Sequence, residues 1–149
     1  TTKTFFSNLD SLGVEWGEQG ITDERSYSGK QSTKVNEGVP YGSTLGLSVI
    51  DLGPTGKRKL RFSAMVWSEA VRPEVSIAYS YRGSEGDYGH SYFGLGHAIK
   101  EPEKWTKVEV EVDLTEGQDT SHLWVAYPHN PTSVNVFLDD LKYEVVTYE

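Results

Sequence analysis

The sequence predicts an all-β fold, a sandwich of two antiparallel sheets formed as one domain over residues 1–149. Apolar and polar residues alternate over many short runs, which is the periodicity of half-buried strands and not of helices. Turn residues, mainly Gly and Pro, separate these runs, as at 53–56 and 128–131. About nine strands fit the pattern, as expected for two packed sheets with one core.

The alternation also predicts which residues of each strand share a face. The sets that share one face are Leu60, Phe62, Ala64 and Val66; Val75, Ile77, Tyr79 and Tyr81; Val108, Val110, Val112 and Leu114; and Leu123, Val125 and Tyr127. The first and last sets are expected to face the core. On that expectation Trp67 and Trp124 face outward.

Composition limits the functions that this chain can have. The formal net charge is −8, which argues against a nucleic-acid partner because phosphate contacts need clustered Lys and Arg. No apolar run reaches the roughly 18 residues that a spanning helix needs, so no membrane partner is expected. The chain has no cysteine and therefore no disulfide or thiolate metal site. Its 9 Tyr and 4 Trp give it a surplus of aromatic rings.

Four short motifs follow one another along nearly the whole chain. They are SGK at 28–30, KLRFSAMVW at 59–67, WTKV at 105–108 and LDDL at 138–141. In this order they resemble the jelly-roll carbohydrate-binding modules of families 4, 9 and 22. The resemblance implies a non-catalytic module appended to a secreted glycan-degrading enzyme.

Two adjacent carboxylates, Asp139 and Asp140, interrupt the apolar closing run. Neighbouring strand residues point to opposite faces, so at least one of these aspartates is expected to face inward. A buried carboxylate must be paired, hydrogen-bonded or bound to a metal. The resemblance implies a structural Ca²⁺ held by Asp139, by the backbone of Lys30 and by an early residue, for which Asn8 is the candidate. Two solvated or hydrogen-bonded aspartates are the alternative.

Sugar binding requires exposed rings beside polar side chains, because C–H patches of a sugar stack on ring faces. Outward-facing tryptophans are unusual on a plain surface, so Trp67 and Trp124 are the first candidate stacking rings. The other candidate ligand-binding residues are Tyr79, Tyr88 and Tyr92 as rings, and Glu69, Arg82, Asp87 and His90 as partners of sugar hydroxyls. The alternative is that these rings pack under loops or against neighbouring strands.

Two other functions stay open at this point. Residues 111–116 read EVDLTE, which matches the E-x-D-x-x-E pattern of family 16 jelly-roll glycosidases, with Glu111 and Glu116 as the catalytic pair. Glu111 also fits the polar face of an amphipathic strand, Glu116 fits the start of a turn, and the chain is short for that enzyme class, so no enzyme is expected. The other possibility is a structural or protein-interaction sandwich without a sugar site.

The expected function is therefore binding of a polysaccharide or oligosaccharide. The module is expected to be monomeric within a larger multidomain protein and to be extracellular or displayed on a cell surface.

Overall fold

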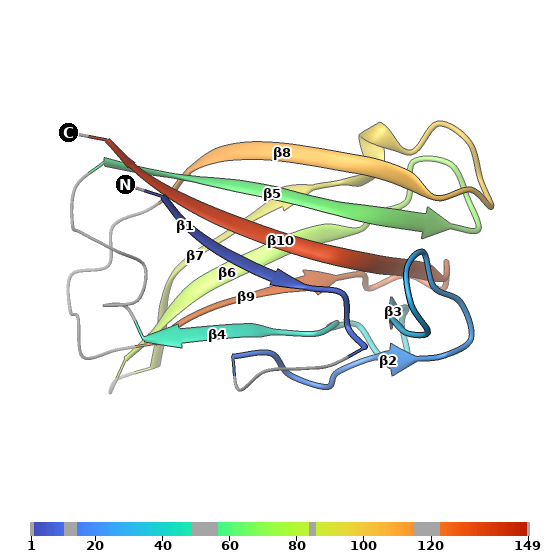
Figure 1. The fold of residues 1–149 in the computed structure, drawn as a ribbon, viewed down its shortest axis with the longest axis horizontal. Helices are drawn as coiled ribbons and strands as arrows, with labels where there is room; N and C mark the ends of the chain where they lie inside the picture. The colour runs from blue at the N-terminus through green and yellow to red at the C-terminus, as the bar shows by residue number, and fades with distance from the viewer. Residues whose placement is uncertain (1, 11–14, 49–56, 84–85, 115–122, 149) are drawn as a thin grey trace.

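A computed structural model describes residues 2–10, 15–48, 57–83, 86–114 and 123–148, which form ten strands and a short 3-10 helix, Gly96–Ala98 (Figure 1). The strands are β1 (Thr2–Ser7), β2 (Ile21–Thr22), β3 (Ser32–Val35), β4 (Leu45–Ser48), β5 (Lys57–Ser68), β6 (Ser76–Gly83), β7 (Gly86–Gly94), β8 (Thr106–Leu114), β9 (Leu123–His129) and β10 (Val136–Tyr148). Within these residues no helix is long and apolar enough to cross a membrane.

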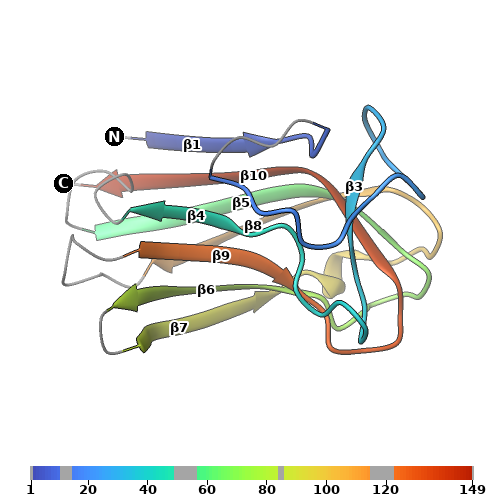
Figure 2. The ribbon, with the colours of Figure 1, turned by 90° about the horizontal axis from the view of Figure 1, so that it is seen from below.

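The strands form two antiparallel sheets that face one another. The larger sheet has the order β2-β3-β10-β5-β8, with β1 also paired to β10, and the smaller sheet has the order β4-β9-β6-β7 (Figure 2). From β3 to β6 the chain changes sheet with every strand, and it does so again between β7 and β10. This order is that of a jelly roll, so the predicted fold class is confirmed.

Strand β10 is the centre of the larger sheet. One edge pairs with β5 along almost its whole length, while the other edge pairs first with β3 and then with β1 (Figure 1). The change of partner falls at Asp139 and Asp140, where the register with β5 shifts and Asp140 takes a positive φ of 50°. The two aspartates therefore lie at an irregular point of the strand, where β10 has no continuous neighbour on that edge.

Three of the four predicted alternations are confirmed. The residues facing the core include Leu60, Phe62, Ala64 and Val66 of β5, Ile77, Tyr79 and Tyr81 of β6, and Val108 and Leu114 of β8. Rings from both sheets meet in this core, where Tyr143 of β10 lies 5.0 Å from Phe62 and 6.4 Å from Trp124 between ring centroids.

The fourth alternation, on β9, was predicted in the wrong phase. Trp124 and Ala126 face the core and are fully buried, whereas Leu123 is exposed and Val125 belongs to the opposite face. Both phases of this strand are apolar, so periodicity alone does not choose between them. The larger tryptophan ring fills the space between the sheets and buries more apolar area there, which decides the phase.

Candidate functional site

The outer face of the smaller sheet has a floor of small side chains. Strand β6 presents Ser76, Ala78 and Ser80 on this face, because Ile77, Tyr79 and Tyr81 point into the core. Ser80 and its register partner Val125 are only 2% and 4% exposed although they face away from the core. Neighbouring residues therefore cover both side chains on this face.

Two tyrosines stand on either side of this floor. Tyr127 of β9 and Tyr92 of β7 are both register partners of Ala78, so they form one row across three strands with alanine in the middle. Two strand spacings separate their backbones, about 10 Å. Tyr92 is 79% exposed, the largest exposed fraction among the exposed large apolar residues of the described chain. The row is open to a ligand that lies across the strands.

Tyr41 extends the row beyond β9. Its ring meets the edge of Tyr127 at 5.2 Å and stacks on His129 at 5.2 Å between ring centroids. The buried Asn130 fixes this arrangement, because its backbone N–H donates to Pro40 and its side-chain amide donates to Val35 and Val134. Asn130 thus ties the segment that carries Tyr41 to the end of β9.

Polar groups complete the site. A hollow of about 330 Å³ is lined by Tyr41, Tyr127, Gln19, Thr44 and Arg82. Gln19 is oriented by the backbone N–H of Thr44, which donates to its side-chain oxygen at 3.3 Å. Amide, hydroxyl and guanidinium groups beside aromatic rings are the combination that recognises sugar hydroxyls and C–H faces together.

One predicted ligand-binding residue lines this hollow, and others lie on β7 with Tyr92. Arg82 lines it, and His90 is exposed two residues before Tyr92 on β7. Strand β7 also carries Tyr88 and Asp87, whose side chains lie outside the described part of the chain.

Trp67 faces outward as predicted, but from the larger sheet, and it is covered. Its ring is only 8% exposed because the guanidinium carbon of Arg25 lies 3.7 Å from the ring centroid. Phe137, its register partner on β10, packs edge-on against the ring at 5.5 Å. A cation over an aromatic face is a favourable contact, so Trp67 is engaged within the protein and is not a free stacking ring.

Trp124 and Tyr79 are not placed to bind a sugar, because both rings belong to the core. Their centroids lie 6.1 Å apart, and the Tyr79 hydroxyl donates to the backbone oxygen of Asp113 at 3.4 Å. The candidate assignment of Trp124 followed from the wrong phase of β9. Tyr79 is a candidate ring whose direction the sequence does not specify, and the structure places it inward.

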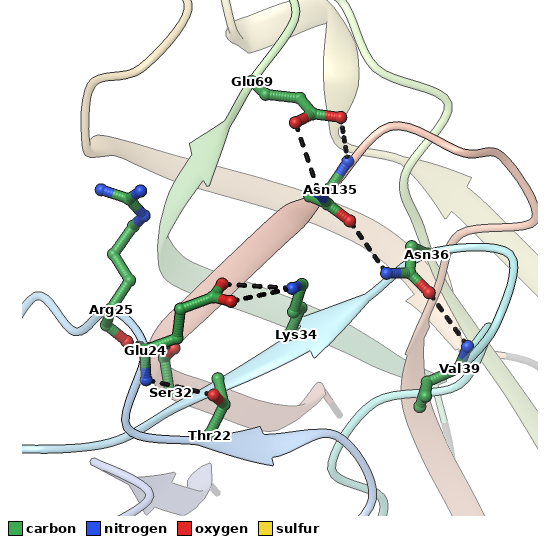
Figure 3. Close-up of polar contacts among 9 residues, drawn as sticks. All are labelled: Thr22, Glu24, Arg25, Ser32, Lys34, Asn36, Val39, Glu69 and Asn135. Atoms are coloured by element: carbon green, nitrogen blue, oxygen red, sulfur yellow. Dashed lines mark hydrogen bonds and ion pairs between the residues drawn. The ribbon is translucent and has the colours of Figure 1, made fainter.

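Glu69 joins loops and does not face the hollow. Its carboxylate accepts hydrogen bonds from the backbone N–H and the side-chain amide of Asn135, at 2.8 and 3.3 Å. Asn135 accepts in turn from Asn36, which accepts from the N–H of Val39 (Figure 3). This chain of contacts links the ends of β5 and β3 to the start of β10, and it engages both oxygens of the Glu69 carboxylate.

Sequence reasoning did not select Tyr41, Tyr127, Gln19 or Thr44. Tyr127 was placed inward with the rest of its β9 set, and His129 was read as a loop residue. Tyr127 and His129 alternate with Pro128, and this pattern is the sequence signal that could have placed both rings on the outer face. Tyr41 and Gln19 come from loops, where no periodicity indicates direction.

No protein-family model and no curated protein sequence matches this chain. Solved structures do match it. The CBM22-1 xylan-binding domain of Xyn10C from Paenibacillus barcinonensis has a TM-score of 0.55 and 18% identity, covering 97% of this chain and 95% of its own. A xylan-binding domain from CBM 22 has a TM-score of 0.58 and 14% identity over 97% and 96%.

A third structure holds the CBM22-1 and GH10 modules of Clostridium thermocellum endo-1,4-beta-D-xylanase 10B. Its TM-score is 0.53 at 12% identity, covering 93% of this chain and 26% of that one. The fold is that of carbohydrate-binding modules. The resemblance that the short motifs indicated is thus confirmed at the level of the fold.

The Asp139 carboxylate is buried in this carbohydrate-binding-module fold and is surrounded by N–H donors. One oxygen accepts from the N–H groups of Tyr27 and Ser28, at 2.9 and 3.0 Å, and the other accepts from that of Asp140 at 2.8 Å. Burial raises the pKa of Asp139, and these hydrogen bonds oppose the rise without cancelling it. The neighbouring carboxylate, Asp140, accepts from the Ser28 hydroxyl at 2.6 Å.

The other predicted calcium ligands make hydrogen bonds through some of their atoms. The Asn8 side chain accepts from the N–H of Asp10, while the N–H groups of Lys30 and Gln31 donate to the Asp10 carboxylate. The predicted calcium ligand of Lys30 is its backbone oxygen, which these contacts do not involve. Among the residues described, no group of three or more His, Cys, Asp or Glu side chains is placed to hold a metal ion, but calcium also binds backbone carbonyl oxygens. The calcium site stays a prediction.

A melting experiment decides between calcium and hydrogen bonds at Asp139. If hydrogen bonds alone stabilise the buried Asp139 carboxylate, metal-stripped protein melts at the same temperature with added calcium as with a chelator. A bound ion would instead stabilise the folded state by about 2.7 kcal/mol at a hundredfold excess over its dissociation constant. A calcium-dependent melting temperature that disappears in Asp139→Ala would therefore restore the calcium site.

Glu111 lies on the outer face of the larger sheet. Its carboxylate pairs with the Arg61 side chain at 2.6 Å and with Lys59 at 3.4 Å, and the Arg61 hydrogen bond in particular lowers its pKa. In a catalytic pair one carboxyl holds a proton as the acid and the other stays ionised as the nucleophile. The lowered pKa of Glu111 does not suit the acid, and its carboxylate is engaged by two basic side chains. Glu116, its partner in the sequence pattern, lies outside the described residues.

Proposed function

We propose that this chain is a non-catalytic carbohydrate-binding module that binds a polysaccharide or oligosaccharide along the outer face of the smaller sheet. The row formed by Tyr127, Ala78 and Tyr92 carries the proposal. Two rings separated by a small residue leave a trough between them. A sugar chain lying across the strands stacks on one ring, crosses the alanine and reaches the other.

The polar residues of the site supply orientation. Arg82, Gln19 and Thr44 line the hollow beside Tyr127, where they meet the hydroxyls at the edge of a stacked sugar ring. These residues carry hydrogen-bond donors and acceptors together, which suits hydroxyl groups that also do both. In this arrangement the aromatic rings give most of the binding affinity, and the three polar residues discriminate between sugars.

The similar structures suggest which glycan to test first. Two of them are described as xylan-binding domains, and a third contains xylohexaose. Xylan is accordingly the first ligand that we propose for this face. The third structure also joins its module to a GH10 module, which supports a context of the same kind here: an extracellular or cell-surface protein in which this module accompanies a glycan-degrading enzyme.

Substitution of the two tyrosines tests the site. Tyr92→Ala and Tyr127→Ala are each expected to weaken xylan binding by about 1–3 kcal/mol, the range seen when aromatic stacking on a nucleic-acid base is removed. Affinity electrophoresis in gels containing soluble xylan, followed by calorimetry with xylohexaose, measures the loss. Val71→Ala is the control, because Val71 is an exposed apolar residue that lines neither this hollow nor any other described here.

Two outcomes would contradict the proposal. Unchanged affinity in both tyrosine variants would place the ligand elsewhere. Mobility that is unaffected by a broad panel of soluble polysaccharides would favour the spacer or protein-interaction alternative. Release of reducing sugar from any of them would point to an enzyme.

A further inference from the structure

A second hollow lies on the opposite side of the molecule, on the outer face of the larger sheet. Its volume is about 300 Å³, and it is lined by Phe6, Tyr27, Met65, Lys107, Asp140 and Lys142. None of these residues takes part in the tyrosine row described above. The hollow is therefore separate from the face on which the proposed function depends.

A short side chain creates this hollow. Phe6, Lys142, Ser63 and Glu109 are successive register partners, so they form a row across β1, β10, β5 and β8. Ser63 is the small member of the row, between longer side chains on both sides. The irregularity of β10 at Asp140 lies beside it and opens the surface further.

Two exposed aromatic rings form the walls. Phe6 is 55% exposed on β1, and Tyr27 is 52% exposed on the loop before β3. The position of Tyr27 is fixed, since its N–H and that of Ser28 donate to Asp139 and its ring meets Trp105 edge-on at 5.8 Å. A ring held in this way loses little conformational entropy when a ligand stacks on it.

Two lysines flank the floor. Lys107 pairs with Glu109 at 3.0 Å and Lys142 pairs with Glu144 at 3.4 Å, and both pairs are substantially exposed to solvent. An ammonium group has three N–H donors, so each lysine can bond a ligand while it keeps its glutamate. The surrounding glutamates and the net charge of −8 disfavour a polyanion but allow a single carboxylate between the two ammonium groups.

From these contacts we infer that the hollow is a second saccharide site, one that takes a sugar unit carrying a single carboxylate. The sugar ring stacks against Tyr27 or Phe6, and its carboxylate lies between Lys107 and Lys142. Asp140 faces the same hollow and accepts from sugar hydroxyls. The neighbouring hollow of about 390 Å³, which shares both lysines and continues to Arg61, gives room for the rest of an oligosaccharide.

Two disaccharides that differ in one group provide the test. Cellobiouronate carries one carboxylate, and cellobiose has a neutral hydroxymethyl group in its place. In an NMR titration, cellobiouronate is expected to shift the amide signals of residues 63–65, 107 and 140–142 and to bind about tenfold more tightly than cellobiose, the gain expected of one charge-assisted contact. The preference should weaken as salt is added.

Variants identify the residues responsible. Lys107→Met and Lys142→Met keep the apolar stems, so the fold is expected to persist while the double variant loses the preference for cellobiouronate. Lys100→Met, an exposed lysine outside the hollow, and Tyr92→Ala, from the smaller sheet, should leave it unchanged. Equal binding of the two disaccharides, the absence of binding, or shifts confined to the smaller sheet would each overturn the second site. Xylan binding lost only in Tyr92→Ala would still uphold the first.

Discussion

Trp124→Ala is expected to lower the free energy of unfolding by about 3–5 kcal/mol, because it empties a space that a large ring fills between the two sheets. The ring is fully buried and contacts Tyr79 and Tyr143. Urea unfolding followed by circular dichroism measures the change without relying on tryptophan fluorescence. The matched control is Tyr92→Ala on the exposed face, for which stability should change by no more than about 0.5 kcal/mol.

The same pair of variants separates packing from binding. Folded Trp124→Ala protein should still bind xylan, whereas Tyr92→Ala should remain stable and bind weakly. The reverse result, a stable Trp124→Ala protein that has lost its sugar affinity, would mean that Trp124 is a stacking ring after all.

Asp139→Ala is the second change with a large expected effect. It leaves the partly buried N–H groups of Tyr27, Ser28 and Asp140 without their acceptor, and a fully buried group of this kind costs about 1–3 kcal/mol. Removal of a buried carboxylate offsets part of this cost. We expect a net loss of about 3 kcal/mol in urea unfolding. Asp140→Ala, which removes a hydrogen bond to the Ser28 hydroxyl, should cost less.

The pH dependence of stability provides an independent check on Asp139. Its pKa is raised in the folded state, so the folded protein holds this proton at pH values where the unfolded chain has released it. The stability that this group confers is therefore lost as pH rises from the ordinary aspartate pKa of 3.8 through the raised one. Relative to Asp139→Asn, wild-type protein should become less stable across that range. The opposite slope would show that the N–H groups outweigh burial.

The sequence predicts the fold well because buried and exposed positions alternate along each long strand, and this alternation is visible in the residue types. In β5 the alternation placed Leu60, Phe62, Ala64 and Val66 correctly, and it also placed Trp67 outward. It did not reveal that Trp67 is covered, because Arg25 reaches the ring from a loop 42 positions earlier in the chain. Contacts between distant segments leave no periodic signal.

The candidate site was predicted less well for a related reason. On β9 both phases are apolar, so the choice between Trp124 and Val125 depends on the volume available between the sheets. On β6 the small residues Ala78 and Ser80 carry no chemistry of their own. They contribute to the site because β9 and β7, on either side of β6, carry Tyr127 and Tyr92. Which strands flank β6 is set by the order of strands in the sheet, and local sequence does not specify that order.

The pairing of β1 with β10 determines how the module would respond to mechanical load. Thr2 is the register partner of Val146, so the start of the first strand and the end of the last lie together at one end of the sheet (Figure 1). A pulling force applied through these two points loads the β1–β10 hydrogen bonds one after another, in the unzipping geometry. In the shear geometry all of them would bear the load at once. Strand β1 would detach at low force, while β3 and β5 still hold β10 and the tyrosine row on the other sheet stays intact.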